Sequence, residues 1–128
     1  MKIKILYEDP YLVLVEKPQG IPVQKDPSKN QDLLTSTEFF LKLNDNLGHD
    51  EKLHLINRID RPVGGIVMMA KNKASAEYYS NALKNHSIEK YYLAVCCGNP
   101  DETHRTLTDY LKVHSDKNMT EITDQSDG

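Results

Sequence analysis

A short turn rich in proline and glycine, followed by an apolar run, constrains the fold of this chain most. The turn is Pro-Val-Gly-Gly at residues 62–65, and the run at residues 66–70 is apolar enough to be a buried β-strand. Arg58 and Asp60 stand just before the turn. Rigid elements hold reactive groups in place, so this charged pair is a candidate site. A surface ion pair, or an Asp that stabilises the turn, is the competing interpretation.

The remaining pattern predicts a chain of mixed α and β structure. Besides the run above, strands are expected at residues 11–15, 53–56 and 90–97. Helices are expected at residues 33–43, 73–85 and 106–113. Thr35 and Glu38 have the spacing of a capping box, and Asn72 is the expected N-cap of the second helix.

Composition suits a single domain that spans residues 1–128, with 38% hydrophobic and 27% charged residues. No apolar run approaches the roughly 20 residues of a membrane span, and the N-terminus lacks the apolar core of a signal peptide. Cys96 and Cys97 are adjacent and are expected to be small buried residues rather than a disulfide, which suits a reducing cytoplasm. No Cys/His spacing indicates a zinc site.

The net charge of −3 argues mildly against nucleic acid as a partner, but the charge is unevenly distributed. Residues 51–98 hold seven basic and four acidic side chains, a balance of +3, whereas residues 99–128 hold three basic and seven acidic, a balance of −4. The segment with the candidate site is therefore the basic one, as phosphate binding requires.

Three segments in order carry a resemblance to a known family. Residues 57–71 resemble the central motif of the RluA-type RNA pseudouridine synthases, which reads His-Arg-Leu-Asp, a few residues, Ser/Gly-Gly and an apolar strand ending Ala-Lys. Residues 7–23 look like the family's N-terminal signature, two strands around a Lys-Pro-x-Gly turn, here at residues 17–20. Residues 88–95 look like its Lys-x-Tyr-x-Ala strand. The resemblance covers about residues 3–112.

This resemblance implies a fold, a reaction and a set of site residues. The fold is α+β, a mainly antiparallel mixed sheet with packed helices. The reaction is the isomerisation of specific uridines to pseudouridine in ribosomal or transfer RNA, with no cofactor or metal. Asp60 takes the place of the catalytic carboxylate, and Tyr92 that of the tyrosine that lies against the uracil and can pass a proton. Arg58 is expected to occupy the space of the extruded base, while Arg61 and Lys90 are expected to contact RNA.

The chain departs from the family pattern in three places. Asn57 stands where histidine is usual, and Gly64 where serine is common. A later motif with a basic residue has no counterpart. Residues 124–128 close on Asp-Gly, a hairpin-turn signal with no strand after it. The resemblance therefore implies a truncated catalytic domain without its C-terminal half.

Two other functions compete with the enzyme. One is a non-catalytic RNA-binding module, which predicts salt-dependent RNA binding that is indifferent to Asp60→Ala. The other is a self-associating half-domain, because an incomplete sheet exposes an unpaired edge. Single residues also have alternative interpretations. Tyr92 is either the active-site tyrosine or an ordinary core tyrosine. Arg58 either fills the space of the extruded base or pairs with Asp60 or another nearby carboxylate.

Overall fold

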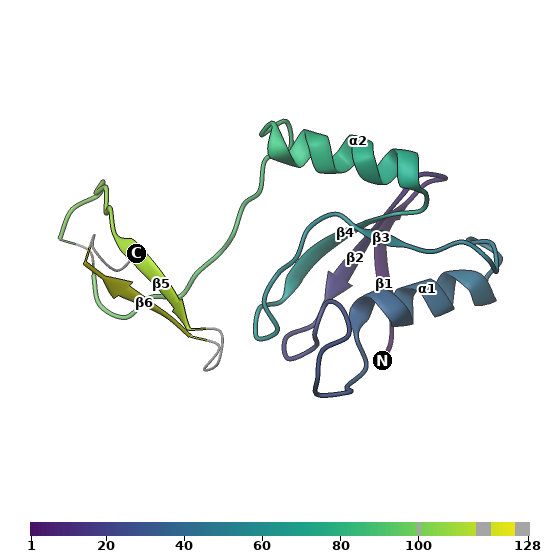
Figure 1. Cartoon of the computed structure of the whole chain (residues 1–128), viewed down its shortest axis with the longest axis horizontal. Coiled ribbons are helices and arrows are strands. Elements are labelled where there is room, and N and C mark those ends of the chain that lie inside the picture. Colours follow the sequence, from purple (N-terminus) through teal and green to yellow (C-terminus); the bar gives the residue numbers. More distant parts are fainter. Residues whose placement is uncertain (100, 115–118, 125–128) are drawn as a thin grey trace. The chain divides into compact units, whose positions relative to one another are not determined.

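Residues 1–99, 101–114 and 119–124 are described by the structure, which is a computed structural model (Figure 1). The chain divides into two compact units, Met1–Tyr91 and Tyr92–Gly128. The first unit, described throughout, holds a four-stranded sheet and two helices, and the described part of the second holds a hairpin. A single domain over residues 1–128 stays a prediction.

The sheet of the first unit is antiparallel throughout, with the strand order β1-β2-β4-β3. Its strands are β1 (Lys4–Glu8), β2 (Leu12–Lys17), β3 (His54–Leu55) and β4 (Gly65–Ala70). Its helices are α1 (Leu33–Leu43) and α2 (Lys73–Lys84). This architecture confirms the predicted α+β fold with an antiparallel sheet. It also confirms the strands expected at residues 11–15, 53–56 and 66–70 to within a few residues.

The hydrophobic core lies on one face of β2 and β4, together with the inner side of α1. Its buried members are Val13, Val15, Val23, Leu33, Leu41, Leu47, Leu53, Val67 and Met69. Alternate residues of a strand point to the same face, which is why Val13 and Val15 share this core. Lys17 is the next residue of that series in β2, and it is also buried. A lysine therefore follows two valines into the interior.

Both helices begin at an N-cap side chain, but only one cap was predicted correctly. Asn72 caps α2 as expected, because its side chain accepts a 2.9 Å hydrogen bond from the amide of Ser75. The capping box of Thr35 and Glu38 is wrong. Asp32 caps α1 instead, accepting a 2.8 Å bond from the amide of Thr35.

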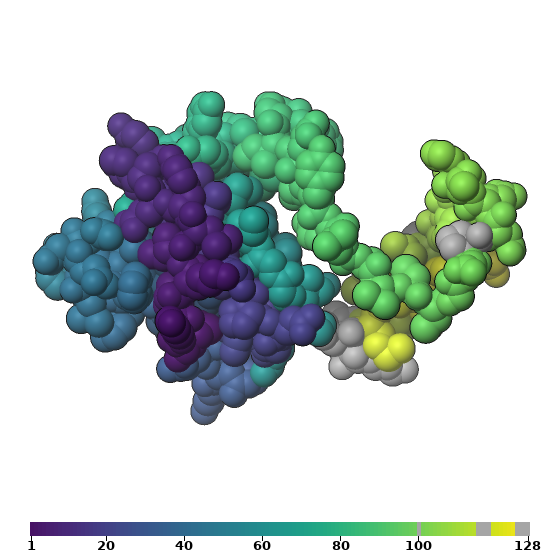
Figure 2. All heavy atoms as spheres, turned by 180° about the vertical axis from the view of Figure 1, so that it is seen from behind, coloured from purple at the N-terminus to yellow at the C-terminus, as the bar shows by residue number. Residues whose placement is uncertain are grey.

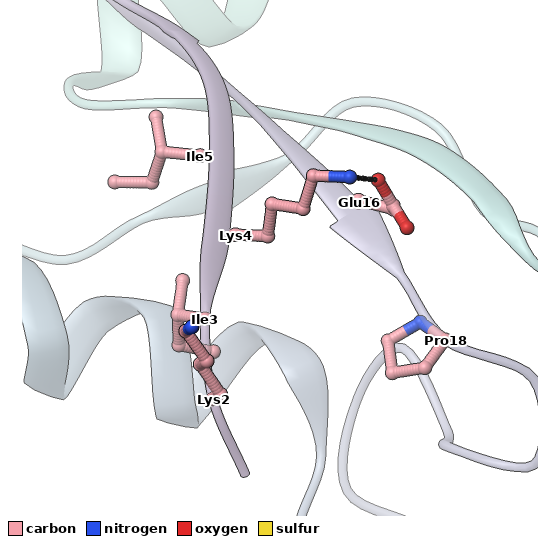
Figure 3. Close-up of a pocket in the computed structure, with 6 residues that line it drawn as sticks. All are labelled: Lys2, Ile3, Lys4, Ile5, Glu16 and Pro18. Atoms are coloured by element: carbon pink, nitrogen blue, oxygen red, sulfur yellow. Dashed lines mark ion pairs between the residues drawn. The ribbon is translucent and has the colours of Figure 1, made fainter.

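β1 forms one edge of the sheet, and the N-terminal residues cover the surface there (Figure 2). The register shifts between Ile5 and Tyr7, which places a bulge in the edge strand. Lys4 forms a 2.5 Å ion pair with Glu16 on β2 (Figure 3). A bulge and an edge lysine both hinder pairing with another chain. Self-association through a sheet edge stays a prediction, and the features of β1 do not favour it.

The described part of the second unit is built around an antiparallel pair, β5 (Tyr110–His114) and β6 (Met119–Thr123). The helix expected at residues 106–113 is therefore wrong. Leu111 and Val113 are alternate residues of β5, and they pair with residues of β6. Pairing with β6 makes this segment a strand, although its local sequence is also compatible with a helix. The Asp-Gly signal at residues 127–128 lies outside the described residues.

The strand expected at residues 90–97 is also wrong, because no described strand pairs with this segment. Its apolar side chains are exposed, and Leu93 and Val95 are each 105% exposed. Cys96 and Cys97 are likewise exposed rather than buried. The expectation of two strands around the Lys-Pro-x-Gly turn is also wrong, because β2 precedes this turn but the next element after it is α1. The strand that pairs with β2 in a hairpin is β1, and that hairpin turns at residues 9–11. An alternating pattern forms a strand only where a neighbouring strand supplies its hydrogen bonds.

Candidate active site

Asp60 lies on the loop that joins β3 to β4, and its carboxylate is exposed. The amide of Val63 donates a 3.0 Å hydrogen bond to the main-chain carbonyl of Asp60, which closes a turn. Within the part of the chain that the structure describes, no side-chain hydrogen bond or ion pair engages this carboxylate. Arg58 is exposed and does not pair with it. The competing interpretations, a surface ion pair and a turn-stabilising Asp, therefore lack the contact that each needs.

One end of this loop is attached to β4 by the side chain of Asn57. Its Oδ1 accepts a 2.7 Å hydrogen bond from the amide of Met68, and its Nδ2 donates a 3.2 Å bond to the carbonyl of Ile66. The amide of Ile56 also donates to the carbonyl of Met68 at 3.0 Å. The chain is therefore fixed to the sheet three residues before Asp60.

The other end of the loop is held by Lys17, which is 1% exposed. Its Nζ donates hydrogen bonds to the main-chain carbonyls of Pro18 (3.1 Å), Ile21 (2.7 Å) and Arg61 (3.0 Å). An ammonium group has three donors, so these three carbonyls satisfy it fully. Burial lowers the pKa of Lys17, and the negative charge of Asp60 opposes part of that shift.

Arg61 fastens the segment after β2 to the same loop. Its carbonyl accepts a 2.8 Å bond from the amide of Gly20, and its Nε donates to the carbonyl of Gly20 at 3.0 Å. One terminal nitrogen lies 3.4 Å from Asp26 Oδ2 and 3.4 Å from Ser28 Oγ. The Arg61 side chain remains 44% exposed. An RNA contact by Arg61 stays a prediction, and the observed contacts are structural.

Tyr92 and Lys90 are both exposed. Tyr92 is the first residue of the second unit and is 63% exposed, so it is not a core tyrosine in this structure. Lys90 is near the end of the first unit, and no described residue forms an ion pair with it. Their assigned roles depend on the motif and stay predictions.

Sequence reasoning missed both anchors of the loop, Lys17 and Asn57. The sequence predicts Lys17 to lie chiefly in a turn, which the family resemblance places near the active-site side, but its position two residues after Val15 also places it on the inward series of β2. The alternation of Val13, Val15 and Lys17 in the sequence is the signal that could have indicated a buried Lys17. Asn57 was noted as a departure from the family, but a side chain that completes a sheet cannot be recognised before the sheet is known.

Two surface hollows lie near the loop, but Asp60 lines neither. One is lined by Leu6, Glu16, Lys17, Pro18, Gln19, Gly64, Gly65 and Ile66. The other hollow lies beside β1, and Glu16 and Pro18 line both hollows (Figure 3). In the described residues, no cluster of His, Cys, Asp and Glu could hold a metal ion, and neither helix could cross a membrane.

Comparison with known proteins gives a consistent result. The model of a family described as RNA pseudouridylate synthase matches residues 11–127. The tRNA pseudouridine synthase C of Pasteurella multocida is 34% identical over 99 residues, which cover 77% of this chain and 38% of that protein. The mitochondrial pseudouridylate synthase RPUSD4 of Xenopus tropicalis is 33% identical over 101 residues, which cover 78% of this chain and 31% of that protein.

A solved structure shows the same relationship. The human protein named RNA Pseudouridylate Synthase Domain Containing 4 matches with a TM-score of 0.54 and 25% identity, over 65% of this chain and 30% of that one. The chain thus spans about a third of the length of these proteins. The resemblance drawn from the three motifs is confirmed.

Proposed function

Because the chain belongs to the RNA pseudouridylate synthase family, we propose that it contributes the Asp60-bearing part of an enzyme that isomerises uridine in RNA. The family is one of isomerases. The reaction breaks the C1′–N1 bond, turns the uracil and forms a C1′–C5 bond. The hydrogen on C5 leaves and N1 gains one, so nothing is oxidised or reduced and no redox cofactor is required.

Asp60 is the proposed catalytic residue. A carboxylate can attack the sugar or stabilise positive charge that develops there, as in glycosidases. The observation that supports this role is that the Asp60 carboxylate has no hydrogen-bond or ion-pair partner among the described residues and lies on a loop anchored at both ends. Such anchoring limits how far the carboxylate can move, which is what a reaction at one atom requires.

Arg58 and Tyr92 complete the proposal. A stacked base is out of reach, so the target nucleotide must be extruded at a cost of a few kcal/mol. The exposed planar guanidinium of Arg58 can stack in the space that the base leaves. The phenol of Tyr92 lies against the uracil and passes the proton from C5. Arg61 and Lys90 add positive charge for the RNA backbone.

The substrate is proposed at the level of structured RNA. Relatives are named for transfer RNA and for the large ribosomal subunit, and both remain candidates. The basic balance of residues 51–98 supports phosphate binding by the segment that carries Asp60.

The test is the conversion of RNA labelled with tritium at C5 of uridine, since the new bond releases that tritium. We expect Asp60→Asn to abolish release and to leave RNA affinity close to that of the unmodified protein. Asp50→Asn, an exposed aspartate elsewhere in the first unit, serves as the matched control and should release tritium normally. Continued release by Asp60→Asn would show that another group does the chemistry. RNA binding without release by either protein would favour the non-catalytic module.

A further inference from the structure

We propose that Asn57 is a positioning residue for Asp60, because its side-chain amide takes the place of a backbone strand beside β4. The proposal rests on the proposed function for its catalytic consequence. The geometry itself can be tested without any turnover.

The strand β3 is short, because only His54 and Leu55 pair with β4, opposite Ala70 and Met69. The amide of Ile56 then makes the last backbone bond of this ladder, to the carbonyl of Met68. On its other side, β4 pairs with β2 along its whole length.

Beyond Ile56 the side chain of Asn57 continues the ladder. Met68 would otherwise present an unpaired amide and Ile66 an unpaired carbonyl on this edge, and Asn57 binds both, at 2.7 and 3.2 Å. Unpaired backbone groups of a partly buried strand are costly. The sheet therefore stays paired while the backbone of residues 58–61 leaves it. If β3 continued in the same register, residues 57–59 would stay in the ladder opposite residues 65–67, and the chain could not leave the sheet before Asp60.

The two bonds of the Asn57 side chain to Ile66 and Met68 form a clamp on the edge of β4. A residue at position 57 can form this clamp only if its side chain has one donor and one acceptor side by side. A carboxamide has both, and it does not titrate. A neutral imidazole also has one of each, but an imidazolium has two donors and would oppose the amide of Met68. Histidine, usual at this position in the family, could therefore act as a clamp only in its neutral form. The contacts made by Asn57 do not depend on pH.

The loop that carries Asp60 is held at two points, one on each side of Asp60. Lys17 and Gly20 hold the carbonyl of Arg61, after Asp60, and Asn57 holds the chain before it. Removing the Asn57 contacts leaves the far anchor intact, so Asp60 gains freedom without loss of the fold. Misplacement of a reacting group by about 1 Å can reduce a rate on the order of a hundredfold.

The experiment compares the unmodified chain with Asn57→His and Asn57→Ala by amide hydrogen exchange at Met68, corrected for intrinsic rates, between pH 5.5 and 8. The unmodified chain should protect Met68 at every pH. Asn57→His should protect it at pH 8 and lose at least about tenfold of that protection at pH 5.5, below the ordinary histidine pKa near 6.5. Asn57→Ala should lose protection throughout. His54, Arg58 and Asp60 are the nearest titratable residues in sequence, and they are common to all three proteins.

Turnover supplies the second measurement. The kcat of Asn57→His should fall with the same pH dependence as its Met68 protection, relative to the unmodified protein, while the KM for RNA changes little. Equal Met68 protection in all three proteins would overturn the clamp. Lost protection with unchanged kcat would overturn the positioning role. Failure of the unmodified protein to convert uridine would count against the proposed function, and Met68 exchange would still decide the clamp.

Discussion

The ammonium group of Lys17 donates a 3.0 Å hydrogen bond to the main-chain carbonyl of Arg61, which stands 44 residues further along the chain. This bond joins the end of β2 to the residue that follows Asp60. The same ammonium group holds the turn after β2 through the carbonyls of Pro18 and Ile21. One buried charge therefore fixes two loops against each other.

Lys17→Met tests this role. The substitution removes the Lys17 donor from the carbonyls of Pro18 and Ile21, while the Arg61 carbonyl keeps its bond from the Gly20 amide. An unsatisfied buried polar group costs about 1–3 kcal/mol. We expect the free energy of unfolding, measured by urea denaturation, to fall by about 2 kcal/mol. Lys4→Met is the matched control, because the exposed pair of Lys4 with Glu16 contributes less than about 1 kcal/mol. Equal effects of the two substitutions would contradict the role of Lys17.

Asp60→Asn should lower the pKa of Lys17 further. Burial lowers this pKa from 10.5 and the charge of Asp60 raises it, so removing that charge leaves burial unopposed. A lowered folded pKa means that the unfolded chain binds the proton more tightly, so the contribution of Lys17 to stability rises with pH between the folded value and 10.5. Asp60→Asn widens that interval.

NMR titration of the Lys17 Cε resonance measures this shift directly. Asp26→Asn removes a carboxylate that contacts Arg61 instead, and it should leave the pKa of Lys17 close to that of the unmodified chain. An unchanged pKa in Asp60→Asn would show that the two charges do not interact.

Gly65→Ala should disturb the loop more than Gly64→Ala. Gly65 has φ +152°, a conformation that other residues rarely adopt, and an added Cβ would lie 3.4 Å from Ile59 Cδ1. Such backbone strain costs about 1–3 kcal/mol. A Cβ at Gly64 meets Gln19 Cγ at 3.3 Å and the carbonyl oxygen of Lys17 at 3.4 Å. The second distance is an ordinary contact, so only the Gln19 side chain has to shift. Thermal unfolding of both variants gives the comparison, and a larger loss for Gly64→Ala would contradict it.

Asp9 should make stability fall in acid. The amide of Tyr11, the hydroxyl of Tyr7 and the amide of Leu12 all donate to its carboxylate, and these bonds hold its pKa below 3.8. A group with a lowered folded pKa stabilises above its ordinary pKa, and that contribution is lost as the pH falls through the folded value.

The measurement is the difference in thermal stability between the unmodified chain and Asp9→Asn. It should be largest at a pH well above 3.8 and should shrink as the pH falls below 3.8 and Asp9 takes up its proton. Asp50→Asn, at an exposed aspartate for which the described residues show no side-chain bond, is the matched control. A difference for Asp9→Asn that stayed constant down to pH 2 would exclude the mechanism.

The sequence by itself determined the elements whose signals are local. The apolar period of residues 33–43, the Asn72 cap and the apolar run of β4 each depend on neighbours a few residues away, and the structure has α1, α2 and β4 where they were expected. The three ordered motifs determined the family for the same reason, since each can be recognised within one short segment.

Only the tertiary structure decided how Asp60 is held. The bond from Lys17 to Arg61 joins residues 44 apart, and the bond from the Met68 amide to Asn57 joins residues 11 apart, so neither lies within one turn of a helix or one pair of neighbouring strand residues. The segment at residues 90–97 shows the same dependence in reverse, because its alternation predicts a strand but no described strand pairs with it. Local periodicity sets which face a side chain occupies. The partners available at that face depend on the whole fold.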